Sequence, residues 1–97
     1  MLYKKSKYMT AKSNPIRKQK SDTEESIRLK EIGERLRYFR KKAGYTNSEY
    51  FAYEHNISRP QYGKYEAGAN IQLNTLMKIL KALNVSLEEF FSGFTKV

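Results

Sequence analysis

From about residue 22 onward, the chain is divided into five short segments that each carry apolar residues at helical spacing. In the first segment these residues recur at steps of three and four: Leu29, Ile32, Leu36, Phe39 and Ala43. Ser21 or Asp22 is expected to cap this helix, and Gly44 follows a basic run that is typical of a helix C-terminus. Nowhere do Val, Ile and Thr alternate with polar residues over strand length, so the sequence predicts an all-α fold.

A capping box is predicted at the start of the second helix. In the sequence TNSE, Thr46 would accept a hydrogen bond from the backbone amide of Glu49, whose carboxylate would reach back. The helix then runs to about His55, with Ala52 as a small residue that lets another helix come close. After it, Asn56 is expected to adopt the left-handed conformation that closes a tight turn.

The third helix is predicted from Arg59 to about Ala67. Ser58 is a good N-cap, and Pro60 stands in the first turn, where its missing amide proton would lack an intrahelical partner anyway. Gly68 is expected to end the helix.

At about 100° per residue, this third helix has two different faces. Tyr62 and Tyr65 fall on one side, which is expected to pack against the first two helices. The opposite arc, with Gln61 at its edge, holds two long cations and two residues of low profile: Arg59, Pro60, Gly63 and Lys64. Gly63 costs a helix interior roughly 1 kcal/mol relative to Ala. It is explained either by packing against a neighbour or by close approach of a partner such as the major groove of DNA.

Two more helices are predicted in the last third of the chain. The fourth has a strong apolar stripe: Leu73, Leu76, Ile79, Leu80 and Leu83. Asn74 or Thr75 stands near its expected start and Asn84 at its end. The sequence SLEE, which begins at Ser86, predicts a second capping box and a short fifth helix that ends near Gly93.

Length and charge suggest one domain preceded by a basic tail. Ninety-seven residues, 39% hydrophobic and 30% charged, suit a single small domain, which we predict over residues 22–97. Residues 1–21 carry +7 of the net charge of +9, hold no acid and show no helical period, so a flexible, disordered tail is expected. Such a charge favours a polyanionic partner such as nucleic acid, although basic tails also aid solubility or touch anionic lipid.

The composition also argues against several classes of function. The chain has no cysteine and a single histidine, His55, so we predict no metal site and no cofactor. It has no Gly-rich phosphate loop and no paired-acid constellation, so we expect no enzyme. It has no apolar run of the kind found in signal peptides or membrane spans, and a cytoplasmic protein is expected.

Residues 28–92 resemble the Cro and phage-repressor (XRE-like) type of helix-turn-helix transcription regulators. Three stretches carry the likeness, namely a first helix, the helix-turn-helix and a closing pair: LKEIGERLRYFRKKAG, NSEYFAYEHNISRPQYGKYEAG and LMKILKALNVSLEEFF. The resemblance implies a five-helix repressor-like domain that binds double-stranded DNA in a sequence-specific manner. Its recognition helix, residues 59–67, would lie in the major groove.

The resemblance implies a set of DNA-binding residues. The family's base-contacting positions fall on the arc described above: Arg59, Pro60, Gly63 and Lys64. Arg59 is suited to bond bidentately with a guanine. Ser58 and Gln61, at the edges of this arc, belong to the same predicted set. In relatives the start of the second helix holds a phosphate, and here Asn47 and Ser48 occupy that end.

The resemblance also implies structural roles. Glu66 matches a family glutamate that pairs with an arginine late in the first helix, which here is Arg40. His55 stands where relatives commonly have an aliphatic residue, so it is expected to be a partly buried packing residue. The loop after Gly68 lacks the basic residues that many relatives place there. The tail or three cations late in the first helix are expected to compensate: Arg37, Lys41 and Lys42.

Other hypotheses about partners stay open. The same helices could form an antitoxin-like module that neutralises a toxin-like protein partner, whereas RNA is a poor fit because A-form grooves do not admit a helix well. Large apolar groups near the C-terminus are either a homodimer surface or a cover of the monomer core: Leu87, Phe90, Phe91 and Phe94. A dimer would place two recognition helices in successive major grooves, about 34 Å apart.

Overall fold

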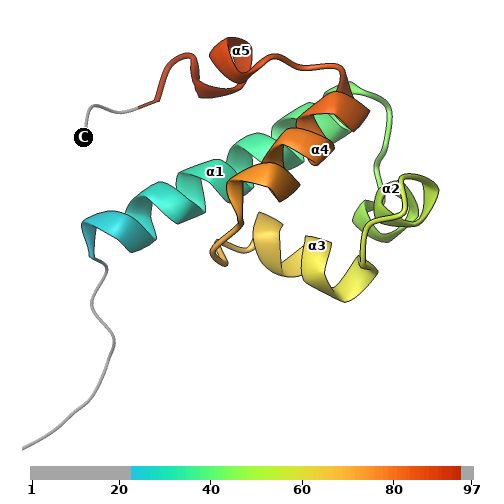
Figure 1. Ribbon diagram of the computed structural model, residues 1–97, viewed down its shortest axis with the longest axis horizontal. Coiled ribbons are helices and arrows are strands. Elements are labelled where there is room, and N and C mark those ends of the chain that lie inside the picture. The colour runs from blue at the N-terminus through green and yellow to red at the C-terminus, as the bar shows by residue number, and fades with distance from the viewer. Residues whose placement is uncertain (1–22, 95–97) are drawn as a thin grey trace, which may run out of the picture.

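The computed structural model describes residues 23–94 and contains five helices (Figure 1). Their bounds are α1 Glu24–Lys42, α2 Ser48–Glu54, α3 Arg59–Glu66, α4 Leu73–Leu83 and α5 Leu87–Phe91. No strand occurs within residues 23–94, and the predicted all-α fold is confirmed. The predicted basic tail, residues 1–21, lies outside the described residues.

Thr23 caps α1, where Ser21 or Asp22 was expected. Its hydroxyl accepts a hydrogen bond from the amide of Ser26 at 3.1 Å. The prediction was wrong because Thr23 directly precedes the first helical residue, and only from there does a side-chain oxygen reach the third amide of the helix. Acidic residues fill the first turn of α1 and basic residues the last, which suits the helix dipole.

Asn47, and not Thr46, caps α2. Its Oδ1 accepts a hydrogen bond from the amide of Tyr50 at 3.0 Å. The predicted capping box was wrong because α2 begins one residue later, which makes Glu49 the second residue of the helix rather than the third. The predicted turn after α2 is confirmed, since Asn56 has a φ of 58°.

The N-cap residues of α3 and α5 are those predicted from the sequence, but the second half of the capping box at Ser86 is absent, because the carboxylate of Glu89 makes no hydrogen bond with residues 23–94. Ser58 Oγ accepts from the amide of Gln61 at 3.4 Å, and Ser86 Oγ accepts from the amide of Glu89 at 3.0 Å. Asn84 ends α4 with a φ of 60°, in the left-handed region that its short polar side chain tolerates. Ser58 therefore fixes the start of α3, and Asn84 and Ser86 fix the end of α4 and the start of α5.

The start of α4 differs from the prediction. The helix begins at Leu73, before Asn74 or Thr75, and its N-cap residue Gln72 makes no side-chain capping bond. Leu73 is 65% exposed and does not belong to the apolar stripe. The other four members of the predicted stripe are buried in the core: Leu76, Ile79, Leu80 and Leu83.

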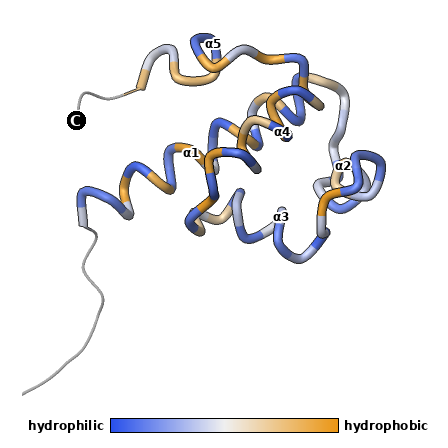
Figure 2. Tube along the Cα trace, in the orientation of Figure 1, coloured by the Kyte–Doolittle hydropathy of each residue, from blue (hydrophilic) through white to orange (hydrophobic). Residues whose placement is uncertain are grey.

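One apolar core joins all five helices. Its buried members outside α4 come from α1, α2, the turn after α2, α3 and α5: Leu36, Phe39, Phe51, Ala52, Ile57, Tyr62 and Phe90. Hydrophobic and hydrophilic residues alternate along α1 and α4, as expected of helices that bury one side (Figure 2). The long helix α1 lies between α5 on one side and α3 on the other (Figure 1).

Helices α1 and α3 are in close contact at Gly33. A Cβ at this position would lie 2.5 Å from the carbonyl oxygen of Glu66 and 2.7 Å from that of Tyr65. No larger residue fits without separating the two helices, so Gly33 sets where α3 sits on α1. The sequence analysis did not single out this glycine.

Candidate nucleic-acid interface

Helix α3 buries one face and exposes the other. Tyr62 is fully buried, with its ring centroid 5.2 Å from that of Phe51 in α2, and Tyr65 is half-buried. The six residues of α3 and its cap that were predicted to bind DNA are all exposed and form what we call the α3 surface: Ser58, Arg59, Pro60, Gln61, Gly63 and Lys64.

Gly63 has no packing role within the described part of the chain. A Cβ built at this position would meet no atom within 4 Å. The first of the two explanations for this glycine, packing against a neighbour, is therefore excluded for residues 23–94. The second explanation, close approach of a partner such as DNA, stays a prediction.

The two cations of the α3 surface are not used by the fold. Arg59 and Lys64 are exposed, and the side chain of neither forms a hydrogen bond or ion pair with another residue of the 23–94 span. Their charges are thus available to a partner. By contrast, Lys78 of α4 donates to the carbonyl oxygen of Asn56 at 3.1 Å.

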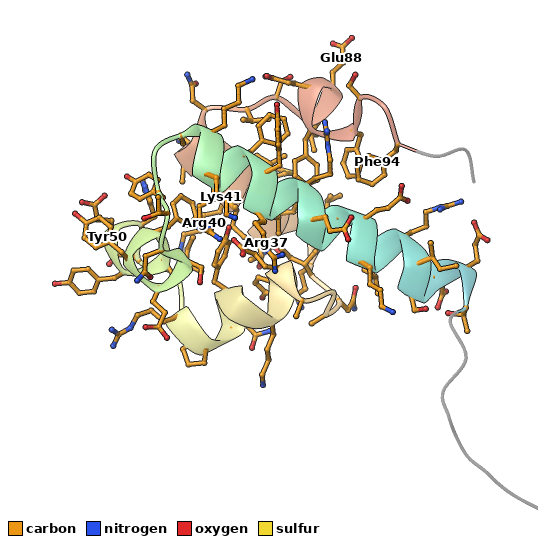
Figure 3. The ribbon with its side chains drawn as sticks, turned by 180° about the vertical axis from the view of Figure 1, so that it is seen from behind. Arg37, Arg40, Lys41, Tyr50, Glu88 and Phe94 are labelled. Atoms are coloured by element: carbon orange, nitrogen blue, oxygen red, sulfur yellow. The ribbon has the colours of Figure 1, made fainter. Side chains whose placement is uncertain are left out.

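Arg40 and Glu66 hold α3 against α1. Arg40 Nε lies 2.7 Å from Glu66 Oε2, and both side chains are almost completely buried. Arg37 Nε lies 3.6 Å from Glu66 Oε1, and Figure 3 shows Arg37 and Arg40 together on the side of α1 that faces α3. Burial is the largest single influence on the pKa of Glu66 and would raise it, but the hydrogen bonds donated by Arg40 and the charges of Arg40 and Arg37 act together against it, and the net pKa is lowered. The carboxylate of Glu66 in turn raises the pKa of Arg40, so both groups are charged.

The start of α2 adjoins the α3 surface. Asn47 is exposed and Ser48 is half-buried at this end of the helix. A shallow depression between α2 and α3 is lined by residues of both: Asn47, Glu49, Tyr50, Tyr53 and Arg59. The sequence analysis missed Tyr50 and Tyr53 because two exposed tyrosines on a short helix give no signal of their own, and it assigned Glu49 to capping.

A polar cluster fixes the outer side of α2. Tyr45 Oη and Tyr50 Oη each donate a hydrogen bond of 2.7 Å to the carboxylate of Glu54. These bonds lower the pKa of Glu54 and raise the pKa of both tyrosines. His55 is half-buried, with its ring centroid 4.8 Å from that of Phe51, in agreement with the packing role expected for it.

The four large apolar residues near the C-terminus, expected either to form a homodimer surface or to cover the monomer core, divide between buried and exposed positions. Phe90 is fully buried and its ring packs 6.0 Å from that of Phe39, so its prediction as a dimer contact was wrong. The short helix α5 turns Phe90 inward, where it closes the monomer core. Leu87 and Phe91 are exposed, and Phe94 is half-buried.

The described residues contain no candidate metal-binding cluster and no candidate membrane-spanning helix. Within residues 23–94, no group of three or more His, Cys, Asp or Glu side chains is placed to hold a metal ion. In the same span, no helix combines the length and the apolar character that crossing a membrane requires.

Comparison with known proteins identifies the family. A family model described as helix-turn-helix matches residues 36–90. The crystal structure of the restriction-modification controller protein C.AhdI from Aeromonas hydrophila is similar, with 30% sequence identity and a TM-score of 0.61. The match covers 67% of this chain and 98% of that one. No protein of curated function matches the chain. The family resemblance inferred from the sequence is confirmed, and the chain belongs to the XRE-type helix-turn-helix family of DNA-binding transcription regulators.

Proposed function

We propose that this protein binds double-stranded DNA in a sequence-specific manner and that α3 enters the major groove. The observation that carries the proposal is the α3 surface, on which two unpartnered cations flank a glycine with no packing role. The major groove of B-DNA, about 12 Å wide, admits an α-helix. Because Gly63 presents no side chain there, the backbone of α3 can come close to the base edges.

Each residue of the α3 surface has a distinct role in this proposal. Arg59 donates two hydrogen bonds to the O6 and N7 of one guanine, a contact worth about 1 to 3 kcal/mol of discrimination. Lys64 contacts a guanine or a phosphate. Gln61 lies at the edge of the surface, and Pro60 and Gly63 offer apolar contact, for example to a thymine methyl group.

Polar groups around α3 are proposed to contact phosphates and so fix the register on the duplex. Asn47 uses its Oδ1 for the cap of α2, which leaves its amide nitrogen as a donor. Ser58 accepts the capping bond of α3 and keeps its hydroxyl proton to donate. Ser48 and the exposed Lys41 of α1 complete this set.

The proposed biological role is the control of transcription. The similar solved structure is that of a restriction-modification controller protein, which supports gene control over the antitoxin-like hypothesis. Exposed apolar side chains at α5 support a homodimer, with Leu87 and Phe91 as its proposed contacts and Phe94 at the margin. Sedimentation of the L87S/F91S variant beside the wild type tests this, since a shift to monomer is expected.

Selection of bound duplexes from a random pool tests the proposed function. We expect one preferred sequence, bound with an affinity that falls steeply with salt, at a log–log slope of roughly −0.9 per phosphate neutralised. R59A should lose the preference at one base position while keeping the others. K81A is the matched control, because Lys81 is an exposed cation of α4 that lies beside residues 84–86 and Glu89. A wild type that enriches no sequence, or binding that ignores salt, contradicts the proposal.

A further inference from the structure

Glu49 lies next to the cation that is proposed to contact guanine. Glu49 and Arg59 line one open depression together with Pro60, and they also line the depression that continues along α2 to Tyr53. The carboxylate comes from the first turn of α2 and the guanidinium from the first residue of α3. Two oppositely charged side chains from different helices therefore share one exposed hollow at the edge of the α3 surface.

The fold itself makes no use of this carboxylate. The side chain of Glu49 forms no hydrogen bond or ion pair with any residue of the described span, and the cap of α2 is made by Asn47 instead. An acid in a first turn does interact favourably with the helix dipole, but only weakly at an exposed position. Beside a surface that meets phosphates, a carboxylate lowers affinity for every duplex. A role in selecting the sequence would offset that cost.

We propose that Glu49 is a positioning residue for Arg59, an inference that rests on the proposed function. A guanidinium has five N–H donors in a planar fork, and a guanine takes only two of them. In the complex the carboxylate of Glu49 accepts a hydrogen bond from the donors that guanine leaves free, which orders a long and mobile side chain. Where Arg59 finds no guanine, the carboxylate still repels the phosphates, so a wrong sequence is penalised.

The test compares E49Q, R59A and the double variant on two duplexes. One is the preferred duplex from the selection, and the other has the guanine assigned to Arg59 replaced. E49Q should bind the replaced duplex more tightly than wild type does, because a like charge is gone. The ratio of the two affinities should fall by about threefold or more, a coupling of the size found between residues in contact. In the R59A background, E49Q should leave the ratio unchanged.

Glu88 supplies the matched control. It is an exposed glutamate in the second position of α5, as Glu49 is in α2, and it lies on the other side of α1 from α3 (Figure 3). E88Q should change the affinities for the preferred duplex and for the replaced duplex only slightly and by the same factor. Thermal unfolding followed by circular dichroism should give the same midpoint for E49Q and E88Q, within a few degrees.

Three results would overturn the inference. An unchanged ratio in E49Q alone would show that Glu49 does not act on discrimination. An equal fall of the ratio with and without Arg59 would show that the carboxylate acts on a base or on the fold, independently of the arginine. A wild type with no preferred duplex would remove the proposed function itself, whereas the first two results leave that function intact.

Discussion

Replacing Gly63 by alanine should make the protein more stable and a weaker DNA binder at the same time. Gly63 lies inside α3, where alanine is favoured over glycine by about 1 kcal/mol. The new methyl group would meet no atom of residues 23–94 within 4 Å, so no steric cost opposes the gain. We therefore expect the free energy of unfolding to rise by about 1 kcal/mol, measured by urea denaturation.

Duplex binding should respond in the opposite direction. The methyl group would stand between the backbone of α3 and the base edges, and overpacking a close contact costs about 1 to 3 kcal/mol. That corresponds to an affinity roughly five- to 150-fold lower, measured by fluorescence anisotropy on the preferred duplex.

Gly33 is the matched control, because it lies in the helix that packs on α3. A Cβ there would lie 2.5 Å from the carbonyl oxygen of Glu66, so G33A should lower the free energy of unfolding by about 1 to 3 kcal/mol. If G63A bound DNA as tightly as the wild type, the close approach of α3 to the groove would be refuted. If G63A were destabilised like G33A, the open surroundings of Gly63 would be refuted.

Three other substitutions test how α3 is held in place. R40M should lower the free energy of unfolding by about 3 to 5 kcal/mol, because it leaves the buried carboxylate of Glu66 without its main partner; urea denaturation measures this. The folded pKa of Glu66 lies below its ordinary value of 4.5. The contribution of ionised Glu66 to wild-type stability is therefore fully present above that pH and is lost as the pH falls through the folded pKa. In R40M the ionised carboxylate of Glu66 should destabilise the folded state instead, so its contribution to the free energy of unfolding should fall as the pH rises. A series of denaturation curves at different pH values would show this. Tyr62 Oη is buried without a hydrogen-bond partner among the described residues, so Y62F should keep or raise the melting temperature. S58A should lower stability by about 1 kcal/mol and weaken binding to all duplexes alike, as a salt titration on two sequences would show.

The sequence predicted the helices better than their first residues. Asn56 and Asn84 were located because few residues tolerate a left-handed backbone, so the type of residue and the conformation are closely linked. The first residue of α2 was misplaced because Thr46 and Asn47 are both good caps and stand side by side. Which of them caps depends on how α2 packs on α1 and α3, and this information is not local.

Features of the candidate site that lie within one helix could be predicted from the sequence, whereas contacts between residues of two different helices could not. The period of α3 alone separated Tyr62 from the exposed cations, and the structure shows the same two faces. The contact of Gly33 with Glu66, and the shared hollow of Glu49 and Arg59, each join residues from different helices. Spacing within one helix carries no information about such contacts, and the pair of Arg40 and Glu66 was expected only through the family resemblance.

The central claim is that Arg59 contacts a guanine in the major groove, and replacing single guanines of the preferred duplex by 7-deazaguanine tests it most directly. The change removes the N7 acceptor from the major groove and leaves base pairing intact. At one guanine the wild type should lose affinity by about fivefold or more, equivalent to roughly 1 kcal/mol for one of two hydrogen bonds. R59A should bind the unmodified duplex and the duplex with 7-deazaguanine at that position equally tightly. A loss at that guanine of the same size in R59A, or no loss at any guanine with the wild type, would contradict the placement of α3 in the major groove.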